Sequence, residues 1–62
     1  MINIIEIPTG NIIKIKKCLI QYLLDNNLIF FVKIYFGKKI NEYMFWNNNL
    51  NKIKKIINNR EC

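Results

Sequence analysis

The chain has 62 residues and a formal net charge of +6. A chain of this length buries only about 60% of the surface that it exposes when unfolded, so residues 1–62 are predicted to form a single domain with a thin margin of stability. The 52% of apolar residues excludes intrinsic disorder, because disordered chains are poor in aromatic and β-branched residues.

The composition also makes the positive charge weaker evidence for a function. Isoleucine, asparagine and lysine fill 34 of the 62 positions, and there is no alanine, serine or histidine. AT-only codons supply these three residues, which indicates an AT-rich coding genome. The net charge therefore reflects composition in part, and a lysine-rich face is a weaker sign of function here than in a balanced sequence.

The first third of the chain contains one clear strand and one ambiguous segment. Residues 2–7 are rich in β-branched side chains and predict a strand, which the turn-forming residues 8–11 end. Residues 12–24 read either as a helix with apolar side chains at 3-4 spacing, or as a strand that alternates at 13–16 and folds back on the first. Lysines near a helix N-terminus oppose the helix dipole, but the apolar spacing persists to Leu23, so the helix is the preferred interpretation.

The most distinct element is a hairpin. Residues 28–36 and 39–46 read as strands joined by a Gly37-Lys38 loop of type II′. This loop would set Lys33 opposite Glu42 as an oppositely charged pair, whereas a three-residue loop would pair Lys33 with Tyr43 and invert the faces of the second strand. Asparagines at 26 and 27 predict the turn before the hairpin, since asparagine tolerates left-handed backbone.

Both faces of the predicted hairpin are apolar, so either both are covered or one binds something. In the preferred register, Phe31, Tyr35 and Trp46 share the face that also carries Lys33 and Glu42. A last helix follows at 50–59, with candidate N-caps among the asparagines at 47–49.

The resulting fold class is α+β, in the order β-α-β-β-α, with an antiparallel hairpin (28–36/39–46) packed by two helices. The alternative order is β-β-α-β-β-α, in which residues 12–16 form a strand.

Missing residue types decide more about chemistry than those present. Without histidine and serine, the usual general base and hydroxyl nucleophile are absent. Glu6 and Glu42 would approach each other only if the first strand joined the hairpin, and two cysteines without histidine do not make a zinc site. We therefore expect no enzyme, no cofactor, no metal and no small-molecule substrate.

The two cysteines and the hydropathy bear on location. Cys18 is expected to be a buried small hydrophobe and Cys62 a free terminal thiol, with no disulfide, which fits a reducing, cytoplasmic compartment. The longest apolar stretch, 18–36, is interrupted by polar residues and is not expected to span a membrane.

Two functions remain open. The first is a non-enzymatic module that binds a protein partner, or a second copy of itself as a homodimer, with contacts expected from Phe31, Tyr35, Trp46, Lys38 and Lys39. Its small size and motif-free sequence fit an accessory protein of a phage or mobile element that inhibits host machinery, such as a CRISPR-type defence complex.

The second function is that of a small, basic, dimeric protein that binds nucleic acid or regulates transcription. In this case the phosphate contacts would come from Lys38, Lys39, Lys52, Lys54 and Lys55. A single arginine in the chain argues against base-specific contacts, because arginine makes the bidentate contacts that read guanine.

Overall fold

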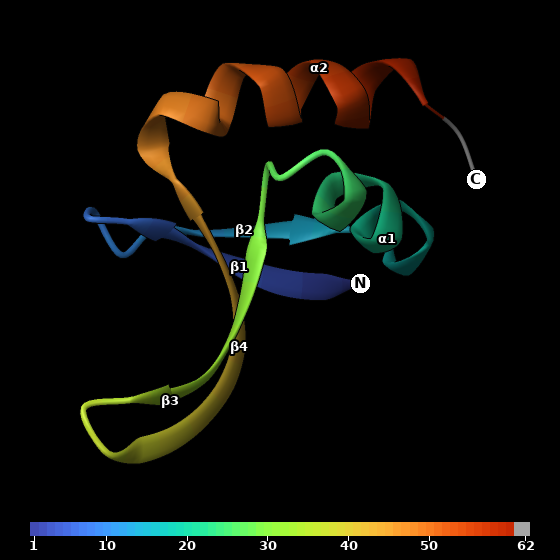
Figure 1. Cartoon of the computed structure of the whole chain (residues 1–62). Coiled ribbons are helices and arrows are strands. Elements are labelled where there is room, and N and C mark those ends of the chain that lie inside the picture. Colours follow the sequence, from blue (N-terminus) through green and yellow to red (C-terminus); the bar gives the residue numbers. More distant parts are fainter. Residues whose placement is uncertain (61–62) are drawn as a thin grey trace.

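The computed structural model describes residues 1–60, which form a four-stranded sheet and two α-helices (Figure 1). The elements in chain order are β1 (Ile2–Ile7), β2 (Ile12–Ile15), α1 (Lys17–Asp25), β3 (Phe30–Tyr35), β4 (Lys38–Trp46), the short 3₁₀ helix η1 (Asn47–Asn49) and α2 (Leu50–Asn59). The α+β class and the hairpin are confirmed. The element order is the β-β-α-β-β-α alternative, so the preferred helix across residues 12–16 is wrong.

Two local features explain why residues 12–15 form a strand. The turn after β1 folds the chain back, because the backbone N–H of Gly10 donates to the Glu6 carbonyl and Gly10 takes a φ of 78°. Ile15 then lies opposite Ile2 and its side chain is buried, while Lys14 stays exposed. Because α1 begins only at Lys17, Lys14 and Lys16 lie outside the helix, where they no longer oppose its dipole.

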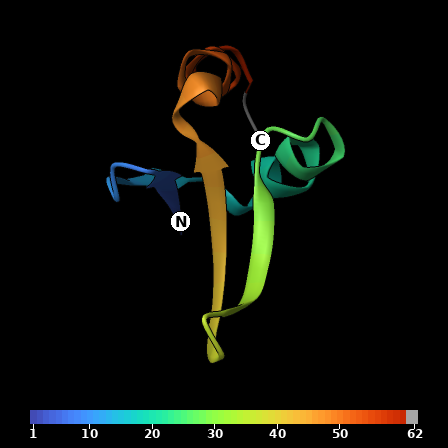
Figure 2. The same ribbon diagram turned by 60° about the vertical axis from the view of Figure 1, so that its left-hand side comes forward.

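The strand order is β2-β1-β4-β3, with β1 parallel to β4 and the other two pairs antiparallel. One face of this sheet carries Ile4, Ile15 and Phe45, which form the core together with apolar residues of both helices. Both helices therefore pack on the same face of the sheet, as the two ribbon views indicate (Figures 1 and 2). Arg60 adds a contact between the helices, since its guanidinium lies 3.7 Å from the centre of the Tyr22 ring.

The hairpin turn differs from both loops considered above. Tyr35 pairs with Lys38, so the loop residues are Phe36 and Gly37, with φ values of 51° and 76°. Positive φ at both loop positions is the signature of a type I′ turn, whose twist matches that of the flanking strands. The predicted Gly37-Lys38 turn of type II′ is therefore wrong.

The predicted register is also wrong. Glu42 lies opposite Val32 instead of Lys33, and Phe31 lies opposite Tyr43. The register shifts between this pairing and the one at the tip, where Ile34 lies opposite Lys39, so β4 contains one extra residue. Asn41 in this stretch has a φ of 49°, which is the left-handed backbone found in one class of bulge, and asparagine tolerates this conformation.

The hairpin continues past the body of the domain. The molecule measures 37 × 21 × 18 Å along its principal axes, and the long dimension includes the end of the hairpin, which extends away from both helices (Figures 1 and 2). Residues 33–41 form this end, which we call the hairpin arm. None of them belongs to the core or packs against it within residues 1–60.

The expectations for the cysteines need correction. Cys18 is exposed at the start of α1 and its sulfur is disulfide-bonded, so it is not a buried thiol. The argument for a reducing compartment rested on unpaired cysteines and loses that support. The expectation for Cys62 lies outside the described residues. Neither helix of residues 1–60 has the length and apolar character needed to cross a membrane.

Candidate interaction surfaces

The tip of the hairpin arm presents three large apolar side chains to solvent. Ile34 is 67% exposed, Tyr35 is 55% exposed and Phe36 is 88% exposed. The rings of Tyr35 and Phe36 meet edge to face with their centres 4.4 Å apart. They contact each other and not the core, so this apolar surface contributes little to folding.

Phe36 is costly for the fold in a second way. Its φ of 51° is the left-handed conformation, which costs an ordinary L-residue roughly 1–2 kcal/mol because Cβ crowds the following carbonyl oxygen. Asparagine or glycine is the usual residue at this position of a type I′ turn. The chain thus places a bulky ring at a position where it gains neither burial nor relaxed backbone.

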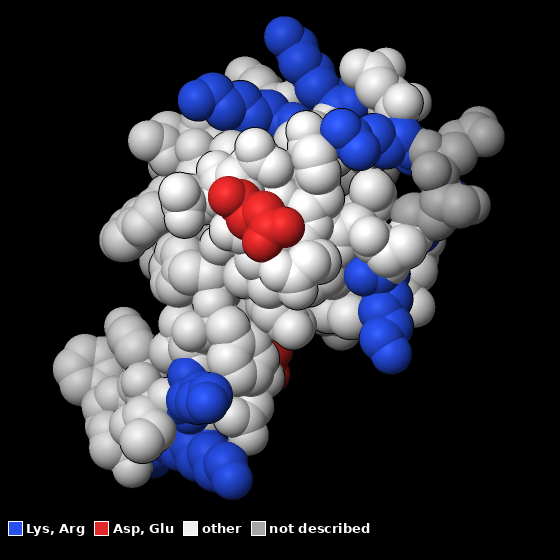
Figure 3. Space-filling view, turned by 45° about the vertical axis from the view of Figure 1, so that its right-hand side comes forward, with Lys and Arg blue, Asp and Glu red and all other residues white. Residues whose placement is uncertain are grey.

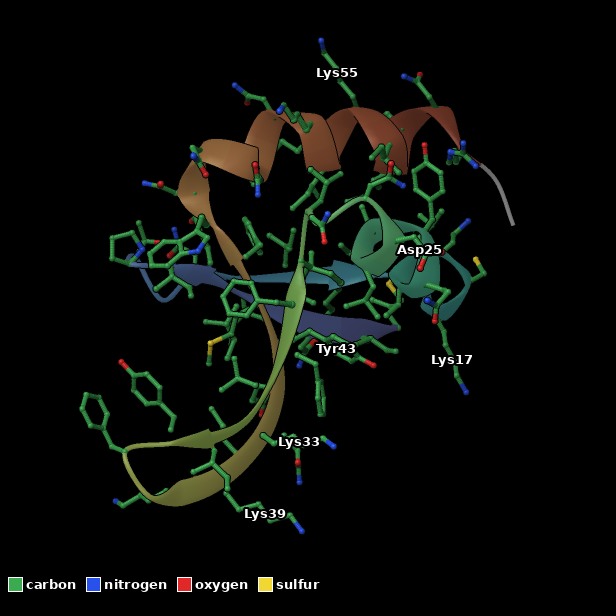
Figure 4. All side chains as sticks on the ribbon, viewed as in Figure 1. Lys17, Asp25, Lys33, Lys39, Tyr43 and Lys55 are labelled. Carbon is green, nitrogen blue, oxygen red and sulfur yellow. The ribbon has the colours of Figure 1, made fainter. Side chains whose placement is uncertain are left out.

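Three lysines flank the apolar tip in the sequence. Lys33, Lys38 and Lys39 are exposed on the arm, and Figure 4 shows Lys33 and Lys39 pointing away from the hairpin. No acidic residue lies within residues 33–41. The arm therefore combines an apolar end with a local charge of three positive groups.

A second apolar surface lies on the sheet face that the helices leave uncovered, which we call the open face. The register places its residues side by side, since Met44 lies between Ile5 and Phe30, and Ile7 lies next to Trp46. Trp46 is 54% exposed, and its ring centre lies 6.4 Å from that of Phe30. The apolar residues of the open face are Ile5, Ile7, Ile12, Phe30, Val32, Met44 and Trp46.

The five residues predicted to contact a partner do not form one surface. Tyr35, Lys38 and Lys39 lie together at the arm, as expected. Phe31 is 41% exposed, but its ring packs at 4.8 Å from that of Tyr43 on the helix side of the sheet. Trp46 lies on the open face. Phe31 and Trp46 are therefore on opposite faces of the sheet. The predicted register placed them on one face because it differed from the observed register by one residue.

Sequence reasoning missed Ile34 and Phe36 as site residues. It assigned Phe36 to a strand face and Gly37 to the first loop position, so the tip carried only lysines. No sequence signal pointed to a Phe36-Gly37 loop, because asparagine, aspartate or glycine usually precedes the glycine of a type I′ turn.

The lysines of the nucleic-acid alternative fall into two distant groups. Lys52, Lys54 and Lys55 are exposed on α2, whereas Lys38 and Lys39 lie at the arm. Figure 4 shows Lys55 and Lys39 at opposite ends of the molecule, and basic side chains stand out at both ends in Figure 3. They do not form the continuous basic stripe that would follow a phosphate backbone.

The acidic residues do not converge on a reactive centre. Glu6 is 6% exposed, and its Oε1 accepts hydrogen bonds from Thr9 Oγ1 at 2.6 Å and Asn11 Nδ2 at 3.2 Å, which organises the turn after β1. Glu6 neighbours Phe45, while Glu42 lies on the opposite face of β4. Residues 1–60 contain no detected pocket and no cluster of three potential metal ligands.

Comparison with known proteins gives no relative for this chain: no family model, curated protein or solved structure matches it.

Proposed function

We propose that the protein is a non-enzymatic interaction module that binds a protein partner through its hairpin arm. The observation that carries the proposal is Phe36, which is 88% exposed and held at a φ of 51°. The exposed ring gains nothing on folding and the backbone conformation opposes it, and unfavourable local conformations of this kind cluster at sites where proteins bind ligands or partners. A contact with a partner would remove the ring from water and provide the missing stabilisation.

The chemistry of the arm supports a particular kind of partner surface. The apolar side chains at its tip fit a groove lined with apolar groups, and Lys33, Lys38 and Lys39 fit a rim of acidic side chains. Complementary charges at a rim raise the rate of association and select against wrong partners. The proposed binding site on the partner is therefore an acidic-rimmed apolar groove.

A protein groove suits this arm better than a nucleic acid. Ile34 is 67% exposed and has neither a planar ring to stack on a base nor a group to bind phosphate. The lysines of α2 lie far from the arm and would be unused. Nucleic-acid binding remains the alternative outcome of the experiment below.

A non-enzymatic module would act by covering a surface that its target needs. Inhibition of host machinery, such as a CRISPR-type defence complex, is the form of this proposal that the sequence already suggested. The arm is consistent with such inhibition, because a projecting hairpin can enter a groove of a larger complex.

The test uses affinity capture with the intact protein as bait, alongside Phe36→Asn and the surface control Lys55→Ala. Wild type and Lys55→Ala should retain the same partner in stoichiometric amounts, and Phe36→Asn should lose it. With the purified partner, Phe36→Asn should weaken binding about 30-fold or more, as for a hot-spot residue worth about 2 kcal/mol. Asparagine keeps the turn geometry, so the loss would not come from misfolding.

Two results would contradict the proposal. Retention of the partner by Phe36→Asn with unchanged affinity would show that the arm tip is not the contact. Salt-sensitive binding of generic DNA or RNA, weakened by Lys52→Ala and Lys54→Ala but unaffected by Phe36→Asn, would favour the nucleic-acid alternative.

A further inference from the structure

The open face is apolar, but its charges balance, unlike those of the rest of the molecule. The chain carries +6 overall, whereas outside the hairpin arm the charged side chains that share this face are Lys14 and Glu42; Lys39 shares it within the arm, opposite Ile34. None of the seven apolar open-face residues belongs to the core or packs against it. An uncovered apolar sheet face of zero net charge can meet an identical face without bringing like charges together.

The strand register makes this face self-complementary. Lys14 lies opposite Asn3, and continuing the β1–β4 register by one residue from Ile4 and Tyr43 sets Glu42 on the other side of Asn3. Two residues further along β1, Ile12 and Met44 lie on either side of Ile5. Both rows are thus centred on β1.

We propose that a second copy of this chain covers the open face in a homodimer whose two-fold axis runs along β1. Such an axis stacks β2 of each copy over β4 of the other, in the aligned packing common for two sheets. Lys14 of each copy then lies over Glu42 of the other, and Ile12 lies over Met44. The two sheets would be about 10 Å apart, a gap that a lysine and a glutamate side chain can bridge together.

The area of the face sets the strength of the dimer. About this axis β3 lies beyond β2 of the other copy, so three strands of each sheet overlap. At about 4.8 Å apart, with about six residues each at 3.3 Å, these strands outline roughly 290 Å² of flat sheet, and the relief of the side chains adds to this. A standard interface takes about 800 Å² from each partner, which is about one sixth of the 4739 Å² accessible surface. The open face is smaller than a standard interface, so we expect a weak, reversible dimer that forms at micromolar to millimolar protein concentrations.

This surface is separate from the hairpin arm, so the dimer goes beyond the proposed function and either can fail without the other. Because the helices lie on the opposite side of the sheet, the lysines of α2 stay outside the interface. The arms project beyond the stacked body and remain accessible to a partner, so the dimer would present two arms.

The experiment is sedimentation equilibrium of the intact protein across micromolar to millimolar concentrations. Wild type should change from monomer to dimer over this range. Lys14→Glu and Glu42→Lys should each weaken the dimer about tenfold or more. The two-fold axis creates two equivalent pairs of positions 14 and 42, and either variant makes both pairs like-charged. The double variant restores both pairs with reversed sign and should recover the wild-type affinity. Circular dichroism checks that all three variants fold.

A second pair of variants tests the apolar part of the interface and the choice of surface. Ile12 is 59% exposed, so Ile12→Asn should leave the fold intact and abolish the dimer, while Phe36→Asn should leave the dimer unchanged. A wild-type protein that stays monomeric to millimolar concentration overturns the proposal. So does a dimer that is insensitive to Ile12→Asn, or a double charge reversal that fails to restore association.

Discussion

Replacing Phe36 by asparagine should make the domain more stable. The native φ of 51° costs phenylalanine roughly 1–2 kcal/mol, a cost that asparagine largely avoids. The substitution loses the exposed ring contact with Tyr35, worth about 0.5 kcal/mol at the low end of measured aromatic pairs. The net expectation is a gain of about 1 kcal/mol.

That gain is large for a domain of this size. At about 0.05–0.15 kcal/mol per residue, 62 residues correspond to a total stability of about 3–9 kcal/mol. A change of 1 kcal/mol moves the melting temperature of such a domain by about 4–8 °C. Thermal and urea unfolding followed by circular dichroism both resolve a difference of this size.

The matched control is Phe36→Ala, which loses the ring but keeps the left-handed strain. It should be no more stable than wild type, so the difference between the asparagine and alanine variants isolates the backbone contribution of about 1 kcal/mol. If the two variants unfold at the same temperature, or if Phe36→Asn is less stable than wild type, the argument from backbone strain is refuted.

Three further predictions concern the body of the domain. Ile53 is fully buried and anchors α2, so Ile53→Ala should cost about 2–5 kcal/mol and Ile53→Val about 0.5–1.5 kcal/mol in urea unfolding; equal losses would show that α2 is not held by this side chain. Thr9→Val should cost about 1–3 kcal/mol because it removes a hydrogen bond to the buried Glu6. In a protein that already carries Glu6→Leu, the same change should cost clearly less, and equal costs in the two proteins would argue against the contact. Arg60→Gln should cost about 0.5–1 kcal/mol, and the same change should be neutral once Tyr22 is replaced by leucine.

Local patterns were enough to predict the hairpin and the last helix. Alternating β-branched and aromatic residues on both sides of Gly37 predict two strands, and the apolar stripe that includes Ile53 predicts α2. The left-handed Asn27, with a φ of 57°, confirms the predicted turn before the hairpin. These elements depend mainly on residues close in sequence.

The candidate site was only partly predictable. Tyr35, Lys38 and Lys39 lie together as expected, because they are adjacent in any hairpin register. The grouping of Phe31 with Trp46 failed, since it depended on the parity of the register, and a change of one residue moves every side chain to the other face. That parity was set by a bulge at the left-handed Asn41, which no alternation pattern in this sequence indicates.

The sequence by itself determined the class of the domain: periodicity, turn residues and apolar content are properties of short segments, and they required strands, helices and a core. Only the tertiary structure decided that residues 12–15 form a strand, because Ile15 gains burial in the core that the sheet shares with both helices, and no local pattern reports this. It also decided which surfaces stay uncovered. Both helices pack on one face of the sheet, and this leaves the open face and the hairpin arm without an intramolecular partner.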